Sequence, residues 1–257
     1  MEEPLTKGRI NRRGVYLKSK NSIDSGAYFY PILFPDDYSI VGKALLDLGL
    51  KLPNGQQLTC LLDEFYRPET FDFFGSKKQH YRMVDSRKEL LVFNTNLWMP
   101  KCSKNAGVYV QYDSQARGMS EFLTADKLEE ALIWATNEGG VRLSKDGKTA
   151  FAPYSTVKLG QNNPEELVRN GFIIASFGLE GVEKLERVSR KFKDYPRVVS
   201  RFMHRIMHGD ESLPVQSFSK LYGFYQSDNL IISGDELVPQ GYAFGVLTSE
   251  EFNALKK

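Results

Sequence analysis

The segment from residue 196 to residue 209 constrains the fold most strongly, because its apolar residues repeat with helical spacing. The residues that would form the buried stripe are Val198, Val199, Phe202, Met203, Ile206 and Met207. At 3.6 residues per turn, these six side chains lie on one face of a helix. Pro196 suits the first helical position, and Gly209 suits a left-handed residue at the helix end. The segment therefore predicts an amphipathic helix that begins at Pro196 and ends at Gly209.

The opposite face of this predicted helix carries cations and no carboxylate. Its members are Arg197, Ser200, Arg201, His204, Arg205 and His208. Cations in the last turn are favoured by the helix dipole, so part of the pattern is what any solvated helix shows. Arg197 would lie in the first turn, which the dipole disfavours. Together with Arg201 and Arg205 it would form a row about 12 Å long, which could follow the phosphates of one strand.

Positive charge is concentrated in two segments of the chain. Residues 7–20 contain six Lys or Arg and no acid, and residues 187–205 contain seven and one acid. Because the whole chain carries a net charge of only +2, the remainder is strongly acidic. The protein would have a polarised surface if the two basic segments lie together in space. The sequence does not place them relative to each other.

These features lead us to predict a nucleic-acid-binding protein that contacts phosphates and has no predicted base specificity. The candidate contacts are Arg190, Lys191, Arg197, Arg201 and Arg205 in a basic helix pair at 180–208, with Arg9, Arg12 and Arg13 in an N-terminal arm. The expected partner is the phosphate backbone of DNA or RNA.

Two alternatives from other classes stay open. In the first, an adaptor protein uses the same basic face to dock an acidic protein partner. In the second, a metal-dependent hydrolase or nuclease takes its carboxylates from the region 63–85, since Mg²⁺ prefers carboxylate oxygens. The acids of that region are Asp63, Glu64, Glu69, Asp72 and Asp85. Their spacing matches no signature, so the sequence does not decide whether the chain is an enzyme and identifies no cofactor.

The catalytic and metal motifs that we tested do not match. Gly147-Lys148-Thr149 ends like a phosphate-binding loop, but Arg142 stands where that motif needs its first glycine. His204 and His208 are spaced to share a zinc ion on one helix face. The surrounding arginines would repel a divalent cation, so we predict no metal site there. The chain contains no GxSxG and no GxGxxG sequence.

The remaining pattern predicts an α+β protein with mostly antiparallel sheets and several short amphipathic helices. The predicted strands are 15–17, 27–34, 57–62, 88–93, 108–112, 141–144, 149–152, 172–177, 221–225, 230–233 and 242–247. Besides the basic pair, helices are predicted at 39–48, after Thr124, from Asn163-Pro164-Glu165-Glu166 and after Thr248. Lys145-Asp146-Gly147-Lys148 predicts a hairpin between the strands 141–144 and 149–152, because Asp-Gly tolerates positive φ.

We expect three parts along the chain. These are a flexible basic arm at 1–13, a strand-rich half at 14–116 and an α+β half at 117–257, with the polar stretch 113–120 as the candidate boundary. No apolar run is long enough for a membrane span or a signal peptide. The two cysteines form no CxxC pair. A soluble cytoplasmic protein without a membrane partner is therefore expected.

Overall fold

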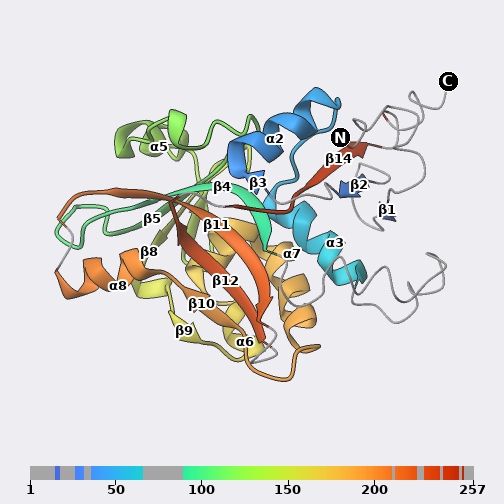
Figure 1. Cartoon of the computed structure of the whole chain (residues 1–257). Coiled ribbons are helices and arrows are strands. Elements are labelled where there is room, and N and C mark those ends of the chain that lie inside the picture. The colour runs from blue at the N-terminus through green and yellow to red at the C-terminus, as the bar shows by residue number, and fades with distance from the viewer. Residues whose placement is uncertain are drawn as a thin grey trace.

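The computed structural model shows an α+β protein built around one large sheet (Figure 1). The structure describes residues 15–17, 27–31, 36–65, 89–209, 212–224, 229–237, 240–248 and 251. The predicted class, α+β with mostly antiparallel sheets, is confirmed. Within these described segments, no helix is both long enough and apolar enough to cross a bilayer.

Nine strands form the main sheet, in the order β6-β7-β8-β5-β4-β11-β12-β10-β9. Their bounds are β4 Leu90–Trp98, β5 Gly107–Tyr112, β6 Thr136–Glu138, β7 Val141–Leu143, β8 Thr149–Pro153, β9 Gly160–Gln161, β10 Arg197–Val199, β11 Val215–Phe224 and β12 Asn229–Glu236. Neighbouring strands are antiparallel except β10 and β12, which are parallel. Five short strands form two smaller sheets: β1 Val15–Leu17, β2 Ala27–Pro31 and β14 Phe244–Thr248, and β3 Asp36–Asp37 with β13 Gln240–Gly241.

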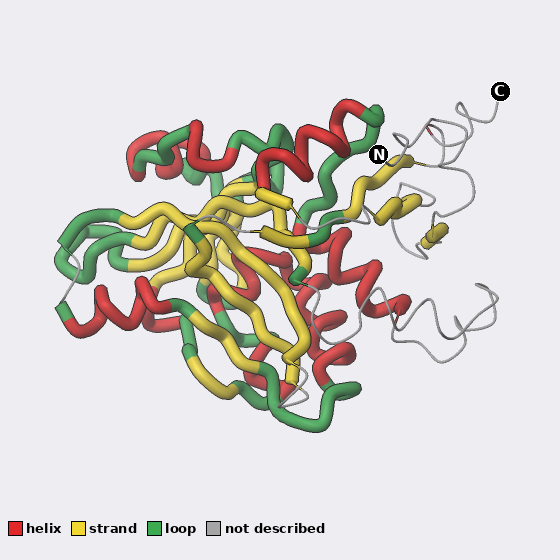
Figure 2. The backbone as a smooth tube through the Cα atoms, viewed as in Figure 1, coloured by secondary structure: helices red, strands yellow, loops and turns green. Residues whose placement is uncertain are grey.

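Helices lie on both sides of the main sheet (Figure 2). Their bounds are α2 Tyr38–Asp47, α3 Gly55–Phe65, α5 Ala125–Ala131, α6 Pro164–Leu167, α7 Gly171–Ser189 and α8 Arg201–His208, with 3-10 turns η2 Gly118–Ser120 and η3 Tyr154–Thr156. Because the sheet is covered on both faces, its central strands have to be apolar on both faces.

β4 shows this requirement residue by residue. All nine of its residues are buried between β5 and β11. Leu90 and Val92 join the core that α3 and α7 share with the sheet, whereas Leu91 and Phe93 join the core beneath α2. Successive side chains of a strand point to opposite faces, so the run of apolar residues serves two cores at once.

The buried polar side chains of β4 form hydrogen bonds with groups on β11 and β12. The indole N–H of Trp98 donates to Ser217 Oγ at 2.9 Å and to the carbonyl oxygen of Gly234 at 3.0 Å. Asn96 Nδ2 donates to Ser219 Oγ at 3.0 Å. The register of β11 on β4 shifts between Phe218 and Ser219, at the same place. These bonds avoid the cost of about 1–3 kcal/mol for each unsatisfied buried polar group.

α3 corrects one sequence prediction, because residues 57–62 were expected to form a strand. The structure places them in a helix that begins with a reciprocal cap: Gln57 N–H donates to Asn54 Oδ1 at 2.9 Å, and Asn54 N–H donates to Gln57 Oε1 at 3.0 Å. An Asn-x-x-Gln capping box was present in the sequence. Pro53-Asn54-Gly55 is also a turn signal, and with the apolar run behind it this signal favours a strand.

α7 corrects a second prediction, because its first half was expected to be the strand 172–177. Asn170 caps it, with its Oδ1 accepting from Phe172 N–H at 3.2 Å. A short buried apolar run is compatible with a strand or a helix, and periodicity does not separate the two. The helix is interrupted at Gly178, whose φ of 68° and ψ of 168° are not helical.

α8 begins five residues later than the sequence predicted, at Arg201 and not at Pro196. Residues 197–199 form β10, and Ser200 caps the helix by accepting from Met203 N–H at 3.1 Å. The predicted start at Pro196 is therefore wrong, since the strand pairing with β12 and β9 takes the first turn. The predicted left-handed end at Gly209, with φ of 81°, is confirmed.

The structure also bears on the remaining helices, strands and segments that the sequence predicts. The helix near 39–48, the hairpin around Gly147, the strands β5, β12 and β14, and the helix start at Asn163 are confirmed within a few residues. β11 includes the predicted strand near 221–225 but begins six residues earlier, at Val215. The main sheet takes strands from both sides of the proposed boundary near residue 116. The arm 1–13 and most of the acidic region 63–85 lie outside the described residues.

One carboxylate fastens α5 to the sheet. Glu129 accepts from the Arg142 guanidinium at 2.9 and 2.5 Å and also from the hydroxyl of buried Tyr109. Asn105 Nδ2 donates to the same Tyr109 hydroxyl at 2.9 Å. The hydrogen bond from Arg142 is the main cause that holds the pKa of Glu129 below its ordinary value.

We expect the Glu129→Gln variant to lose about 2 kcal/mol of unfolding free energy at pH 7. A carboxyl whose folded-state pKa is depressed contributes stability above its unfolded pKa and loses it as the pH falls through the folded-state pKa. The difference between wild type and variant, measured by urea denaturation, should therefore shrink below about pH 4. The exposed neighbour substitution Glu130→Gln is the matched control. An equal difference at pH 7 and pH 3 would contradict this account of Glu129.

Gly55 permits the closest approach between α3 and α7. A Cβ at this position would lie 1.9 Å from the carbonyl oxygen of Ser176, whereas a Cβ at Gly209 meets nothing within 4 Å. We expect Gly55→Ala to lower the free energy of unfolding by about 3 kcal/mol through overpacking. Gly209→Ala should lower the free energy of unfolding by only about 1 kcal/mol, because alanine disfavours the left-handed backbone conformation at this position. If denaturant titrations show that Gly55→Ala lowers the free energy of unfolding less than Gly209→Ala does, the close approach of α3 and α7 at Gly55 is wrong.

Candidate functional site

The cations of the segment 187–205 separate into two groups in the structure. Arg187 and Arg190 take part in ion pairs within the fold. Lys191, Lys193, Arg197, Arg201 and Arg205 are exposed. All seven of these cations are exposed, so each of them can meet a partner at the surface.

Arg187 links the second half of α7 to α3. Its guanidinium donates to the Asp63 carboxylate at 2.8 and 3.2 Å, and the Asp63 side chain is only 8% exposed. The bond to Asp63 raises the pKa of Arg187. Asp63, one of the acids proposed for a metal-dependent hydrolase, is thus engaged with a cation. In the described part of the chain, no group of three or more His, Cys, Asp or Glu could hold a metal ion.

Arg190 links α7 to α6. It donates to Glu186 at 2.8 Å and also to Glu165, and the bond to Glu186 is the main cause that raises the pKa of Arg190. Arg190 was predicted to contact phosphate. Its guanidinium is thus engaged by two carboxylates of the fold. Lys191, the next predicted contact, follows the end of the helix and is exposed.

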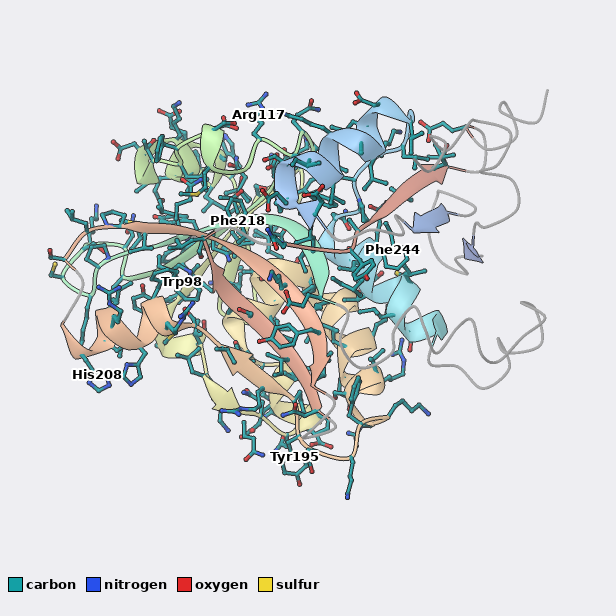
Figure 3. The ribbon with its side chains drawn as sticks, in the orientation of Figure 1. Trp98, Arg117, Tyr195, His208, Phe218 and Phe244 are labelled. Atoms are coloured by element: carbon teal, nitrogen blue, oxygen red, sulfur yellow. The ribbon has the colours of Figure 1, made fainter. Side chains whose placement is uncertain are left out.

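The exposed side of α8 carries four basic side chains, which we call the α8 basic face: Arg201, His204, Arg205 and His208. Phe202, Met203 and Ile206 on its other side are buried in the main core. The rings of His204 and His208 lie side by side, with centroids 4.3 Å apart. Figure 3 shows His208 at the outer end of this helix, away from the sheet. No carboxylate occurs in the sequence between residues 195 and 209.

Arg197 does not continue this face as a third turn of the same helix. It lies in β10, where it pairs with Ile231 of β12 and Gln161 of β9, and its side chain is exposed. The straight row of three arginines is therefore replaced by one arginine on a strand and two on the helix that follows. Tyr195, just before the strand, is 57% exposed. Arg9, Arg12 and Arg13 lie outside the described residues, so the structure does not say whether the arm meets this face.

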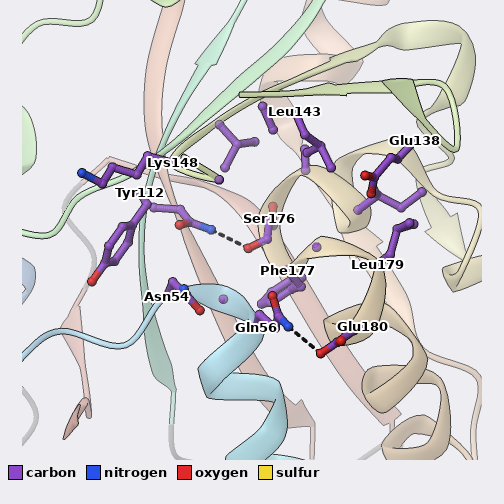
Figure 4. A pocket seen from close by; sticks show the side chains of 18 residues that line it. Asn54, Gln56, Tyr112, Glu138, Leu143, Lys148, Ser176, Phe177, Leu179 and Glu180 are labelled. Atoms are coloured by element: carbon purple, nitrogen blue, oxygen red, sulfur yellow. Dashed lines mark hydrogen bonds between the residues drawn. The ribbon is translucent and has the colours of Figure 1, made fainter. Parts of the chain in front are cut away.

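A second candidate site is a cavity of about 280 Å³ between the sheet, the start of α3 and the middle of α7, which we call the Ser176 pocket (Figure 4). Its apolar wall is formed by Val110, Leu143, Ala150 and Ile174. Its polar lining comes from Asn54, Gln56, Asn94, Glu138, Lys148, Ser176 and Glu180. Sequence analysis missed this site, because its residues come from five separate segments.

The interruption of α7 explains why polar groups gather here. The last carbonyls of a helical segment have no helical N–H ahead of them. Ser176 lies just before the break at Gly178, and its carbonyl oxygen accepts from Asn94 Nδ2 at 2.9 Å. Its hydroxyl is different: Ser176 Oγ is buried and has no hydrogen-bond partner in the described structure.

Tyr112 is not poised for acid–base chemistry in this pocket. Its hydroxyl donates to the carbonyl oxygen of Leu52. Burial raises the pKa of Tyr112 to about 12. Since a general base works best with a pKa near the operating pH, Tyr112 is poorly suited to that role.

Comparison with known proteins assigns no family. No family model matches the chain, and no curated protein matches its sequence. The fold is similar to a solved structure described as "Accommodation of massive sequence variation in Nanoarchaeota by the C-type lectin fold". That structure is 13% identical with a TM-score of 0.48, and the match covers 83% of this chain and 98% of that one. A likeness of this degree assigns neither an activity nor a binding site.

Proposed function

We propose that this protein binds nucleic acid through the phosphate backbone, along the α8 basic face and Arg197. The observation that carries the proposal is the composition of that surface: two arginines and two histidines are exposed on eight residues of helix, in a segment without a carboxylate. Clustered cations of this kind attract a polyanion and release its counterions.

Geometry favours contact with the backbone over recognition of bases. α8 is only eight residues long and is half embedded in the core through Phe202 and Ile206. Its arginines lie one turn apart, which suits neighbouring phosphates. Tyr195 adds an exposed ring on which an unpaired base could stack. Single-stranded DNA or RNA in the cytoplasm is therefore the ligand we favour.

An acidic protein is the second candidate partner for the same surface. Met207 on α8 is 40% exposed, and Leu213 shortly after the helix is 69% exposed. Apolar side chains beside cations are common in protein interfaces and add nothing to phosphate binding. Binding to nucleic acid should weaken with salt and be lost after nuclease treatment, whereas a complex with an acidic protein should survive the nuclease.

We expect the double substitution Arg201→Ala/Arg205→Ala to weaken binding to labelled single-stranded DNA and RNA. Loss of two phosphate contacts should reduce the slope of log K against log salt concentration by about 1.4. The measurement is a fluorescence titration of wild type and variant across a salt series.

The matched control is Lys43→Ala/Lys127→Ala, which removes the same charge from exposed positions on α2 and α5. It should keep the wild-type salt slope. The proposal is wrong if wild-type protein does not bind at low salt or if both double variants lose the same affinity. A partner retained after nuclease treatment and lost in the arginine variant would instead identify an acidic protein.

A further inference from the structure

Exposed apolar side chains gather at the two ends of α5. Met119 and Phe122 precede the helix and are 39% and 74% exposed, and Ile133 and Trp134 follow it and are 66% and 74% exposed. These four belong to the ten large hydrophobic side chains that are exposed in the described part of the chain. Apolar side chains scattered singly over a surface are ordinary, whereas a group of them marks an interaction site.

The inner side of α5 is fixed to the main sheet. Leu128 and Leu132 are buried in one core with Tyr109 and Phe151 of the sheet, and the ion pair of Glu129 fastens the helix further. Figure 1 shows α5 and α8 on opposite sides of the sheet. The outer side of α5 is therefore a firmly mounted surface that is separate from the α8 basic face.

The outer side of α5 carries charges of both signs that the fold does not use. Lys127, Glu130, Ala131 and Trp134 recur at i, i+3, i+4 and i+7, and all four are exposed. Neither Lys127 nor Glu130 forms an ion pair with any described residue. Lys145, in the turn between β7 and β8, holds its Nζ 5.7 Å from the centre of the Trp134 ring. An aromatic ring and two opposite charges thus lie in one row.

The order of these residues along the helix suits a second copy of the same helix. Lys127 is nearer its start, Glu130 is nearer its end, and an aromatic ring lies beyond each end. When two copies of α5 lie antiparallel about a two-fold axis through the middle of the helix, Lys127 of each copy lies opposite Glu130 of the other. The same axis brings Phe122 of each copy beside Trp134 of the other. A parallel arrangement would instead bring like charges together.

We propose that α5 forms the interface of a two-fold, antiparallel dimer of this protein. An aromatic side chain buries about 150–250 Å², so Phe122 and Trp134, each 74% exposed, supply about 300 Å² of the roughly 800 Å² that each partner of a standard interface buries. The two Lys127–Glu130 pairs fix the direction of the helices. The dimer leaves the α8 basic face free, and the proposal does not rest on nucleic-acid binding.

The test is sedimentation equilibrium of the full chain from micromolar to submillimolar concentrations. Wild-type protein should dimerise in this range. Trp134→Ala should raise the dissociation constant at least about 30-fold, because a buried interface tryptophan is typically a hot spot. The control is Tyr195→Ala, which removes another exposed aromatic ring far from α5 and should leave the dissociation constant unchanged (Figure 3).

Charge reversal tests the direction of the helices. Lys127→Glu and Glu130→Lys each bring like charges together twice in a homodimer, so each should weaken self-association about 10-fold. An equal mixture of the two variants restores both attractive pairs and should form a heterodimer about as tight as the wild-type dimer. Both positions are exposed, so the variants should unfold at the wild-type urea concentration.

Three results would overturn the proposal. The first is wild-type protein that stays monomeric at all these concentrations. The second is a Trp134→Ala variant that dimerises as tightly as the Tyr195→Ala control. The third is a mixture of the two charge variants that associates no more tightly than either variant alone, which would exclude the antiparallel pairing of α5.

Discussion

The backbone of α3 meets the backbone of α7 at Gly55, and this contact fixes the arrangement on one face of the sheet. The Ser176 carbonyl sits so close to Gly55 that no side chain fits between them, and Asn94 donates to the same carbonyl from β4. The chain then turns at Gly178 through a conformation that favours glycine. One peptide group is thus held by two elements at the point where α7 breaks.

Both candidate sites depend on where α7 breaks. Before the break, Phe172 and Phe177 are fully buried under the sheet. After it, Arg187 and Arg190 pair with Asp63 and Glu165, which ties the helix to α3 and α6. These two ion pairs join the second half of α7 to its neighbouring helices. The break itself leaves a polar space beside the sheet, which becomes the Ser176 pocket.

The sequence predicts those features that depend on local chemistry. Gly147 and Gly209 were recognised as residues that tolerate positive φ, and Asn163 with Glu166 was recognised as a helix start. Prediction from the sequence fails where tertiary contacts decide between two possible local structures. Residues 197–199 fit a first helical turn, but pairing with β12 makes them a strand. The exposed cations could be found from charge alone. The Ser176 pocket could not, because Ser176 lies in an apolar run and its neighbours come from distant segments.

The central claim is that the fold holds the Ser176 peptide group from β4, at the point where it meets α3 and α7 breaks. The most direct measurement is the free energy of unfolding of Asn94→Leu, by urea denaturation. Leucine is close in volume to asparagine but cannot donate to the Ser176 carbonyl, so the variant should lose about 1–3 kcal/mol. An Asn94→Leu variant as stable as wild type would contradict the claim, because the carbonyl would then need no partner at the break in α7.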